Sequence, residues 1–314
     1  MTDDGGVYDL VIDPWQEGCV LFTHHGSIKV ANRSGVWPLA GSHEEVGDKD
    51  GAGADSRFRG ELQLVAADNK FGDVIINDIH NKKVKLFQRP DVMSSMLLTL
   101  DGRVSGVAHC PDLNMLYISY VDLNRIDVYY LIERTSAFRA HSHEVDKPDK
   151  MVCVDAQRTL YIVSRDEEIL ALDILTDNVT SVYRGDDSHI TALRHVGSNA
   201  VMFIDSRVHS VMMYNMTSRQ LIKLCSLAAD EDLCNSLTPS SFVYDEDEDR
   251  LFIASEGKIF VMQVEADDEL IADVDSVTGG VYNTTSVKLN STDSNKSPVA
   301  QQVCSAGKKT AGKP

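Results

Sequence analysis

One supersecondary unit recurs six times along the chain and limits what the chain can fold into. In each copy, two short apolar strands flank a polar turn, and a third strand and a weaker fourth strand follow. The copies begin at Val11, Val65, Val107, Val152, Leu193 and Phe242. Four strands at a period of roughly 40–55 residues are typical of a propeller blade rather than a solenoid turn. The sequence therefore predicts an all-β, six-bladed β-propeller with four-stranded antiparallel blades, and seven blades are the alternative.

The repeats account for most of the chain. Val, Ile, Leu, Tyr and Phe fill the predicted strands, and Asp, Asn and Gly fill the turns. With residues 269–274 as the last fourth strand, the six units predict a single domain over residues 1–275. Residues 276–314 form a tail rich in Ser, Thr and Lys, in which Val277 to Leu289 could add one edge strand. Beyond about residue 290 we expect disorder, because too little apolar surface remains to offset the entropy of ordering.

One connection between blades resembles the signature of NHL-repeat propellers. Between Val36 and Phe58, a strand ends in Leu-Ala-Gly, and a Gly- and Asp-rich loop leads through Asp-Gly-x-Gly to Ala-x-x-Arg-Phe. Shorter echoes of the family's strand-two exit occur at residues 78–84, 124–126 and 205–207. The resemblance is specific for blades one and two and extends to the others only in pattern. It implies an NHL-like propeller of six blades.

Charge excludes several classes of partner. The chain carries 30 Lys and Arg against 48 Asp and Glu, a net charge of −18. Nucleic-acid and anionic-lipid binding both depend on basic residues, so neither is expected, although some NHL-like propellers bind RNA through a basic face. Acids concentrate between residues 230 and 275. There we predict an acidic docking sector for a basic partner or for the chain's own lysine-rich tail, made of Asp245, Glu246, Asp247, Glu248 and Asp249.

A propeller brings loops from several blades to one face, where residues distant in the sequence can meet. We predict that the chain is a non-catalytic, monomeric binding or scaffold module that presents such loops to a protein or peptide. The candidate binding residues are His24, His25, His80, Asn81, Asn124, Arg125, Arg165, Asp205, Arg207 and His209. Within the NHL-like loop we expect Arg57 to bridge acidic loop residues such as Asp48 or Asp50, which is a structural role.

Histidines on several blades leave a metal-dependent lyase or hydrolase as the alternative function. The predicted loops also carry His43, His141, His143 and His189. The chain resembles the peptidyl-hydroxyglycine lyase propellers in architecture, and that resemblance implies zinc held by histidines from separate blades. His109 and His195, which end first strands, are candidate ligands facing the channel. Because no EF-hand, P-loop, nucleophile elbow or dinucleotide fingerprint appears, we predict no cofactor other than a divalent metal under this alternative.

Cysteines and asparagines in sequons indicate whether the chain is cytoplasmic or secretory, because disulfides and N-glycans form in the secretory pathway. Cys225 and Cys234 are close enough in sequence to form a local disulfide, whereas the other cysteines mostly occupy apolar strands. Asn32, Asn178 and Asn215 lie in Asn-x-Ser/Thr sequons at turns expected between third and fourth strands. No signal peptide is visible, which favours the cytoplasm, but an ectodomain excised from a longer protein would be secretory. No apolar run approaches the roughly 20 residues that cross a bilayer.

Overall fold

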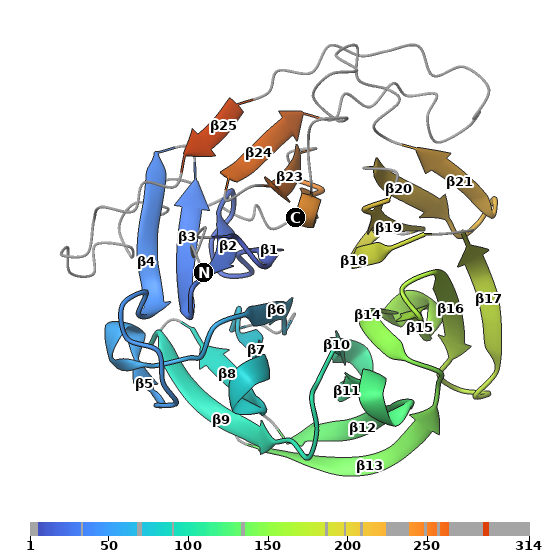
Figure 1. The fold of residues 1–314 in the computed structure, drawn as a ribbon, viewed down its shortest axis with the longest axis horizontal. Coiled ribbons are helices and arrows are strands. Elements are labelled where there is room, and N and C mark those ends of the chain that lie inside the picture. Colours follow the sequence, from blue (N-terminus) through green and yellow to red (C-terminus); the bar gives the residue numbers. More distant parts are fainter. Residues whose placement is uncertain are drawn as a thin grey trace, which may run out of the picture.

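Six antiparallel sheets are arranged in a ring in the computed structural model (Figure 1), which confirms the predicted six-bladed, all-β propeller. Each sheet contains four strands in sequence order, and the second has one short additional strand at its edge. The structure describes residues 6–32, 34–67, 71–89, 91–132, 136–185, 188–197, 199–207, 210–223, 239–247, 250–255, 258–263 and 285–288. No helix in this described part is long and apolar enough to span a membrane.

The first three blades occupy residues 10–144. Blade one contains β1 (Leu10–Ile12), β2 (Val20–His24), β3 (Ser27–Asn32) and β4 (Gly35–Gly41). Blade two contains β6 (Leu62–Ala66), β7 (Val74–Asp78), β8 (Lys83–Gln88) and β9 (Met93–Thr99), with β5 (Gly51–Ala52) paired to β9. Blade three contains β10 (Gly106–Cys110), β11 (Met115–Tyr120), β12 (Arg125–Ile132) and β13 (Ser136–Glu144).

The remaining blades repeat the same order. Blade four contains β14 (Pro148–Val154), β15 (Thr159–Ser164), β16 (Glu168–Asp173) and β17 (Val179–Arg184). Blade five contains β18 (Ile190–Val196), β19 (Ala200–Asp205), β20 (Ser210–Asn215) and β21 (Gln220–Lys223). Blade six contains β22 (Pro239–Asp245), β23 (Arg250–Ser255), β24 (Lys258–Gln263) and β25 (Thr285–Lys288). The fourth strand predicted at residues 269–274 lies outside the described residues, and β25 falls within the segment 277–289 that could add an edge strand.

Four short 3₁₀ turns make reversals between paired strands, and a fifth, η1, lies in the connection from β4 to β6. They are η1 (Gly53–Asp55), η2 (Ile79–Asn81), η3 (Pro111–Leu113), η4 (Val121–Leu123) and η5 (Asp155–Gln157). The last four are each followed by one left-handed residue, with φ between 48° and 53°. Two of these residues are asparagines, which adopt this conformation more readily than most side chains. Such turns keep adjacent strands in register and hold turn residues at a fixed edge of each blade.

The core lies between neighbouring blades. Second strands such as β2, β7 and β23 are buried along their whole length, because both faces of each sheet are covered by an adjacent sheet. In one cluster, Ile75 and Val84 of blade two pack with Leu116 and Ile118 of blade three, and all four are fully buried. Continuous apolar runs in the sequence therefore encode these strands better than strict alternation would.

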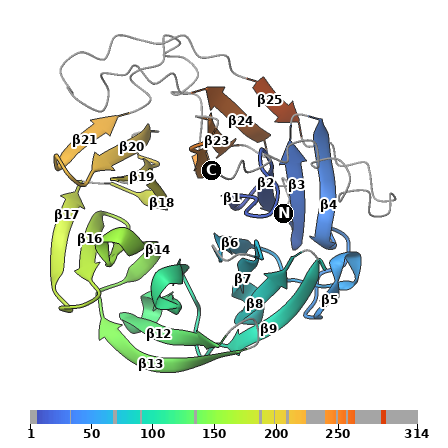
Figure 2. The same ribbon diagram turned by 180° about the vertical axis from the view of Figure 1, so that it is seen from behind.

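Blade one closes the ring against blade six, as both views show (Figures 1 and 2). Within the described residues each blade uses only strands consecutive in the sequence, so closure depends on side-chain contacts. Leu10 and Phe22 pack in one cluster with Phe252 and Ala254. The Ser240 hydroxyl donates a hydrogen bond of 2.9 Å to the Val7 carbonyl.

The NHL-like loop serves the joint between blades one and two, but with partners that the sequence analysis did not predict. Arg57 pairs with Glu45 at 2.6 Å, so it does bridge to an acidic residue of the loop, but the acid is neither Asp48 nor Asp50. Those two acids instead lie 3.1 Å from Nζ of the fully buried Lys85. A buried charge needs a partner of opposite sign, so the Lys85 ammonium group lies between the two aspartates. Arg57 pairs instead with the exposed Glu45.

Candidate functional site

The predicted binding residues occur at equivalent places in five blades. They lie at or beside the turns between second and third strands, namely His24 and His25, His80 and Asn81, Asn124 and Arg125, Arg165, and Asp205 and Arg207. His209 lies outside the described residues. Because all blades share one strand order and pack side by side in a ring, these turns lie on one face of the propeller. We call it the turn face.

Most turn residues brace the connection between blades. The Asn124 carbonyl accepts a hydrogen bond from the Val145 amide at 3.1 Å, and its side-chain oxygen accepts one from Lys147 at 2.9 Å. Asn81 donates to the Gly47 carbonyl at 2.7 Å. These bonds satisfy backbone groups where the chain passes from one blade to the next. The asparagines are thus structural parts of the turn face.

Two charged candidates are also engaged within the fold. Arg165 forms an ion pair with Asp146, which joins the turn of blade four to the connection entering that blade. The Asp205 carboxylate accepts hydrogen bonds from the amides of His189 at 3.3 Å and Arg207 at 3.1 Å. Neither charged group is therefore fully available to a partner.

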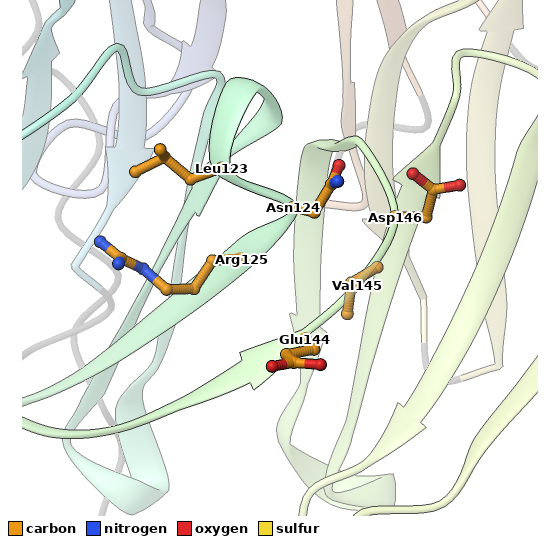
Figure 3. Close-up of a pocket in the computed structure, with 6 residues that line it drawn as sticks. All are labelled: Leu123, Asn124, Arg125, Glu144, Val145 and Asp146. Carbon is orange, nitrogen blue, oxygen red and sulfur yellow. The ribbon is translucent and has the colours of Figure 1, made fainter.

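An open pocket of about 480 Å³ lies on the turn face between blades three and four (Figure 3). Its lining residues are Leu123, Asn124, Arg125, Glu144, Val145 and Asp146. They come from the β11–β12 turn, the start of β12 and the connection from β13 to β14. Two of the predicted binding residues are among them. The pocket combines apolar, acidic, basic and amide groups within one site.

The electrostatics of this pocket are set by which charges already have partners. Arg125 Nε lies 2.9 Å from the buried Asp127 carboxylate, and its guanidinium group lies 5.1 Å from the centre of the Tyr120 ring. Glu144 is exposed at the rim, opposite Arg125 in the β12–β13 register. The apolar side chain of Leu123, which also lines the pocket, is 49% exposed. The site therefore offers one apolar and one acidic contact to an incoming group.

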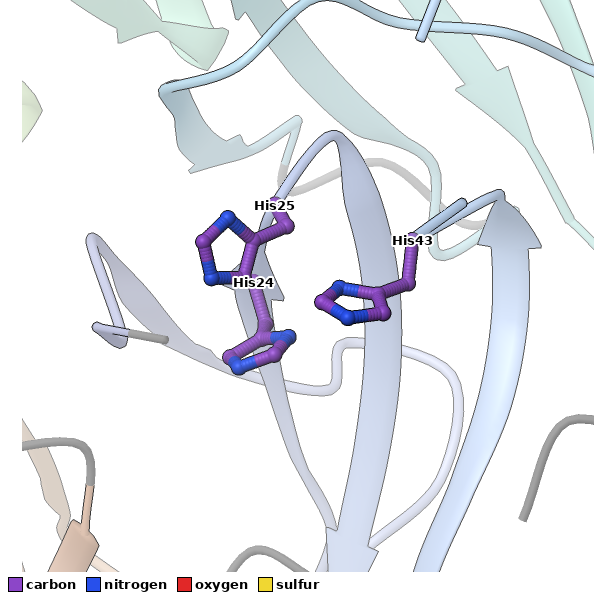
Figure 4. A group of neighbouring side chains, drawn as sticks. All are labelled: His24, His25 and His43. Carbon is purple, nitrogen blue, oxygen red and sulfur yellow. The ribbon is translucent and has the colours of Figure 1, made fainter. Parts of the chain in front are cut away.

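Three histidines gather on the turn face at blade one (Figure 4). His24 ends β2, His25 occupies the β2–β3 turn, and His43 follows β4 by two residues. Their ring centroids are 4.5, 4.9 and 5.2 Å apart. One ligand nitrogen from each ring lies within 4.8 Å of the other two. The sequence predicts all three on one face but does not single them out as a group.

A second histidine pair lies in a strand rather than in a loop. His141 and His143 belong to β13, so their predicted position in a loop is wrong. Their Nε2 atoms are 3.2 Å apart, and His143 Nδ1 lies 3.7 Å from Asp177. Burial and the nearby His141 lower the pKa of His143, and Asp177 opposes this shift. The two rings meet because residues two apart in a strand point to the same face of the sheet.

The two histidines predicted to face the channel lie in no group of metal-ligating side chains among the described residues. His109 lies in β10 of blade three and His195 in β18 of blade five. Burial lowers the pKa of both, that of His109 to about 4. Among the described residues, no group of three metal-ligating side chains within reach of one ion includes either of them. Within the described residues, His109 and His195 therefore have no third metal ligand beside them.

The first strands near the axis instead hold a charge network that the sequence did not reveal. Asp9 pairs with Arg194, and its carboxylate also accepts hydrogen bonds from Ser241 at 2.8 Å and from the Leu64 amide at 2.8 Å. These residues come from blades one, five, six and two. No local pattern signals the network, because its members are up to 232 residues apart.

The predicted acidic docking sector is only partly available. Asp245 is buried and pairs with Arg250 at 2.7 Å, and Glu246 accepts a hydrogen bond from the Gly197 amide. Asp247 is exposed, whereas Glu248 and Asp249 lie outside the described residues. These acids belong to the turn between the first and second strands of blade six, so they lie on the face opposite the turn face.

Two of the described cysteines form a disulfide between blades three and four. Cys110 in β10 and Cys153 in β14 are bonded, with Cα atoms 5.4 Å apart. Because the two sulfurs are bonded to each other, they cannot join the nearby Asp155 in binding a metal ion. Both fall in apolar strand-like runs, which predict small buried apolar residues, and at a sequence separation of 43 no local pattern signals the bond. The predicted Cys225–Cys234 pair lies outside the described residues.

The three sequons lie where predicted, between third and fourth strands. Asn32 ends β3, Asn178 precedes β17 and Asn215 ends β20. Asn178 is exposed, whereas Asn32 and Asn215 are half-buried, and their side-chain oxygens cap the turns that follow. Glycosylation at these positions stays a prediction.

Comparisons with known proteins show the fold and no more. No family model and no curated protein matches the chain. Among solved structures it is similar to a catalytically inactive virginiamycin B lyase from Staphylococcus aureus with quinupristin, at 14% identity over 83% of this chain and 82% of that one, with a TM-score of 0.55. It is also similar to an auxiliary nutrient binding protein from Bacteroides thetaiotaomicron, at 12% identity over 81% and 67% of the two chains, with a TM-score of 0.58. A nidogen/laminin complex matches at 12% identity over 69% and 78%, with a TM-score of 0.53. A β-propeller is thus shown, and membership of the NHL family stays a prediction.

Proposed function

We propose that the chain is a binding propeller that receives a protein or peptide segment at the turn face, in the pocket between blades three and four. The observation that carries this proposal is the open pocket itself, where exposed Leu123 and Glu144 lie beside braced turns. The fold likeness to a nutrient binding protein and to a nidogen/laminin complex adds support. A rigid ring with exposed turns is well suited to this role.

The chemistry of the pocket defines the segment that it fits. Leu123 offers apolar area, and the Glu144 carboxylate can pair with a Lys or Arg of the partner. Arg125 and Asp146 already have ion-pair partners, Asp127 and Arg165, so they contribute shape more than new charge. A peptide with one apolar and one basic side chain is therefore the expected ligand. The overall charge of −18 would speed its approach.

This location revises the earlier docking hypothesis while keeping a basic partner. Asp245 is neutralised by Arg250 inside the fold and lies on the opposite face. Reversing its charge would leave the guanidinium group buried beside a like charge, and loss of binding would then report unfolding. The metal-dependent alternative required histidines at the channel mouth. Among the described residues, the histidines within reach of one ion are His24, His25 and His43, and neither His109 nor His195 is among them. We propose no reaction.

The proposal is tested by selecting random peptides that bind the immobilised full chain and by measuring their affinities for variants. We expect selected peptides to carry a basic and an apolar residue, and Glu144→Lys and Leu123→Asp each to weaken binding at least tenfold. Asp112→Lys is the matched control, since it places the same charge change on the opposite end of blade three. Equal binding by Glu144→Lys and the wild type, or no enriched peptide, would overturn the proposal.

A further inference from the structure

The geometry points to a transition-metal site made by His24, His25 and His43, with zinc as the cation that it fits best. This inference goes beyond the binding function, because the three histidines lie on blade one and the peptide pocket lies between blades three and four. Three neutral imidazoles form a recurring zinc ligand set that leaves a fourth coordination position open.

Local backbone structure brings two of the ligands together. His24 is the last residue of β2, and His25 adopts a left-handed conformation with φ of 47°. The turn is fixed at several points: the Gly26 amide donates to the Gly60 carbonyl at 2.9 Å, and the Ser27 hydroxyl donates to the His24 carbonyl at 2.5 Å. The two rings stand at 89° to each other, with centroids 4.5 Å apart. The pair is therefore held on an ordered turn.

Strand pairing supplies the third ligand. Ser27 at the start of β3 lies opposite Gly41 at the end of β4, so His43 leaves the blade beside the histidine turn. Its ring stacks on His24 at 5.2 Å and meets His25 at 4.9 Å. Figure 4 shows the three rings converging from the turn and from the neighbouring strand end. Sequence spacing alone does not reveal this set, because 17 residues separate His25 from His43 in the printed sequence.

The distances suit metal binding after small side-chain rotations. The nitrogens lie within 4.8 Å of one another. A tetrahedral zinc ion with bonds of about 2.0–2.1 Å needs them roughly 3.3 Å apart. Rotation about the side-chain bonds of the three histidines can close this difference of at most about 1.5 Å without moving the strands. Imidazole ligands favour zinc and neighbouring late transition metals over magnesium or calcium, which prefer oxygen.

Exposure indicates what the bound ion would do. His24 and His25 are only 7% and 9% exposed, whereas His43 faces solvent. The open coordination position therefore faces outward. The ion would fasten the start of the long connection at residues 42–61 to the turn of blade one. It would also offer a partner's imidazole or carboxylate a coordination bond.

The test uses the full chain, stripped with a chelator and titrated with Zn²⁺ by calorimetry and with Co²⁺ by visible absorption. We expect one Zn²⁺ per chain and the intense Co²⁺ bands of a four-coordinate site. His43→Ala should weaken Zn²⁺ binding by more than the roughly 10–100-fold lost when only an outer-shell partner is removed. Because His43 is exposed, this variant should keep the wild-type melting temperature.

His141→Ala is the matched control, because His141 belongs to the other close histidine pair and is also exposed. It should bind Zn²⁺ like the wild type. His25→Ala removes a second proposed ligand and should also weaken Zn²⁺ binding. Absence of Zn²⁺ binding at micromolar concentration, or binding that is lost in His141→Ala and kept in His43→Ala, would overturn the inference.

Discussion

At the residue scale, charged side chains in this propeller serve the joints between blades. Lys85 is the clearest case, because its side chain is fully buried and its ammonium group lies 3.1 Å from both Asp48 and Asp50 and 5.3 Å from the centre of the Phe58 ring. Burial would raise the pKa of Asp48, but hydrogen bonds from Lys83 and Lys85 outweigh it and lower this pKa. Ion pairs from Lys83 and Lys85 thus hold the loop between blades one and two against blade two.

Removing the buried ammonium group should destabilise the chain strongly. Lys85→Ala leaves two carboxylates facing each other beside an apolar ring, and we expect a loss of about 2–4 kcal/mol in the free energy of unfolding. Lys83→Ala is the control, because Lys83 is partly exposed and should lose less than about 1 kcal/mol. Urea denaturation measures both. A loss for Lys85→Ala no larger than that for Lys83→Ala would contradict this role.

His109 should make the fold sensitive to acid. Burial lowers its pKa from 6.5 to about 4, and a backbone hydrogen bond with Ala67 opposes the shift. Between pH 6.5 and 4 the unfolded chain binds a proton that the folded chain does not, so stability falls as the pH falls. The difference amounts to about 3 kcal/mol by pH 4. His109→Gln should flatten this part of the stability profile, measured by denaturation at each pH, and an unchanged profile would refute the assignment.

At the element scale, the turns and strands could be predicted from the sequence because their signals are local. Apolar runs such as Val20–Thr23 and asparagine turns such as Asn124 encode strands and reversals within a few residues. The partners of Asp9 and Cys110 could not be predicted, because contacts between blades join residues that no local pattern relates. His141 and His143 were misplaced because β13 is unusually polar and extends to residue 144.

The Cys110–Cys153 disulfide ties the first strands of blades three and four. It closes a loop with a sequence separation of 43, so replacing both cysteines by alanine should cost about 2–4 kcal/mol of stability. Denaturation of this double variant, next to the wild type, measures the cost. Peptide mapping without reductant should recover the two cysteines as one linked pair. Recovery of two free thiols would show that the bond does not form.

At the scale of the whole molecule, ring closure depends on side chains that cross between blades. Asp9 of blade one is engaged by Arg194 of blade five and Ser241 of blade six, while the Ser240 hydroxyl reaches the Val7 carbonyl. A buried carboxylate of this kind needs its partners, because loss of one leaves an uncompensated charge. This network of Asp9, Arg194, Ser240 and Ser241, which we call the clasp, therefore links blade one to blades five and six.

Breaking the clasp should loosen blades one and six together. Arg194→Ala is expected to cost about 2–4 kcal/mol and to speed hydrogen exchange in β1 and β22. Arg165→Ala removes an exposed ion pair on blade four and should cost less than about 1 kcal/mol. If both variants lose the same small amount and exchange stays slow in β1, the ring is closed by apolar packing alone.

The central claim, that the turn face between blades three and four binds a peptide segment, is tested most directly by hydrogen exchange with a selected peptide bound. The account predicts slower exchange at residues 121–125 and 144–146, which line or adjoin the pocket. Exchange should stay unchanged at 111–114 and 155–158, the turns at the opposite end of the same blades. Slowing confined to those opposite turns, or spread equally over both faces, would contradict the claim.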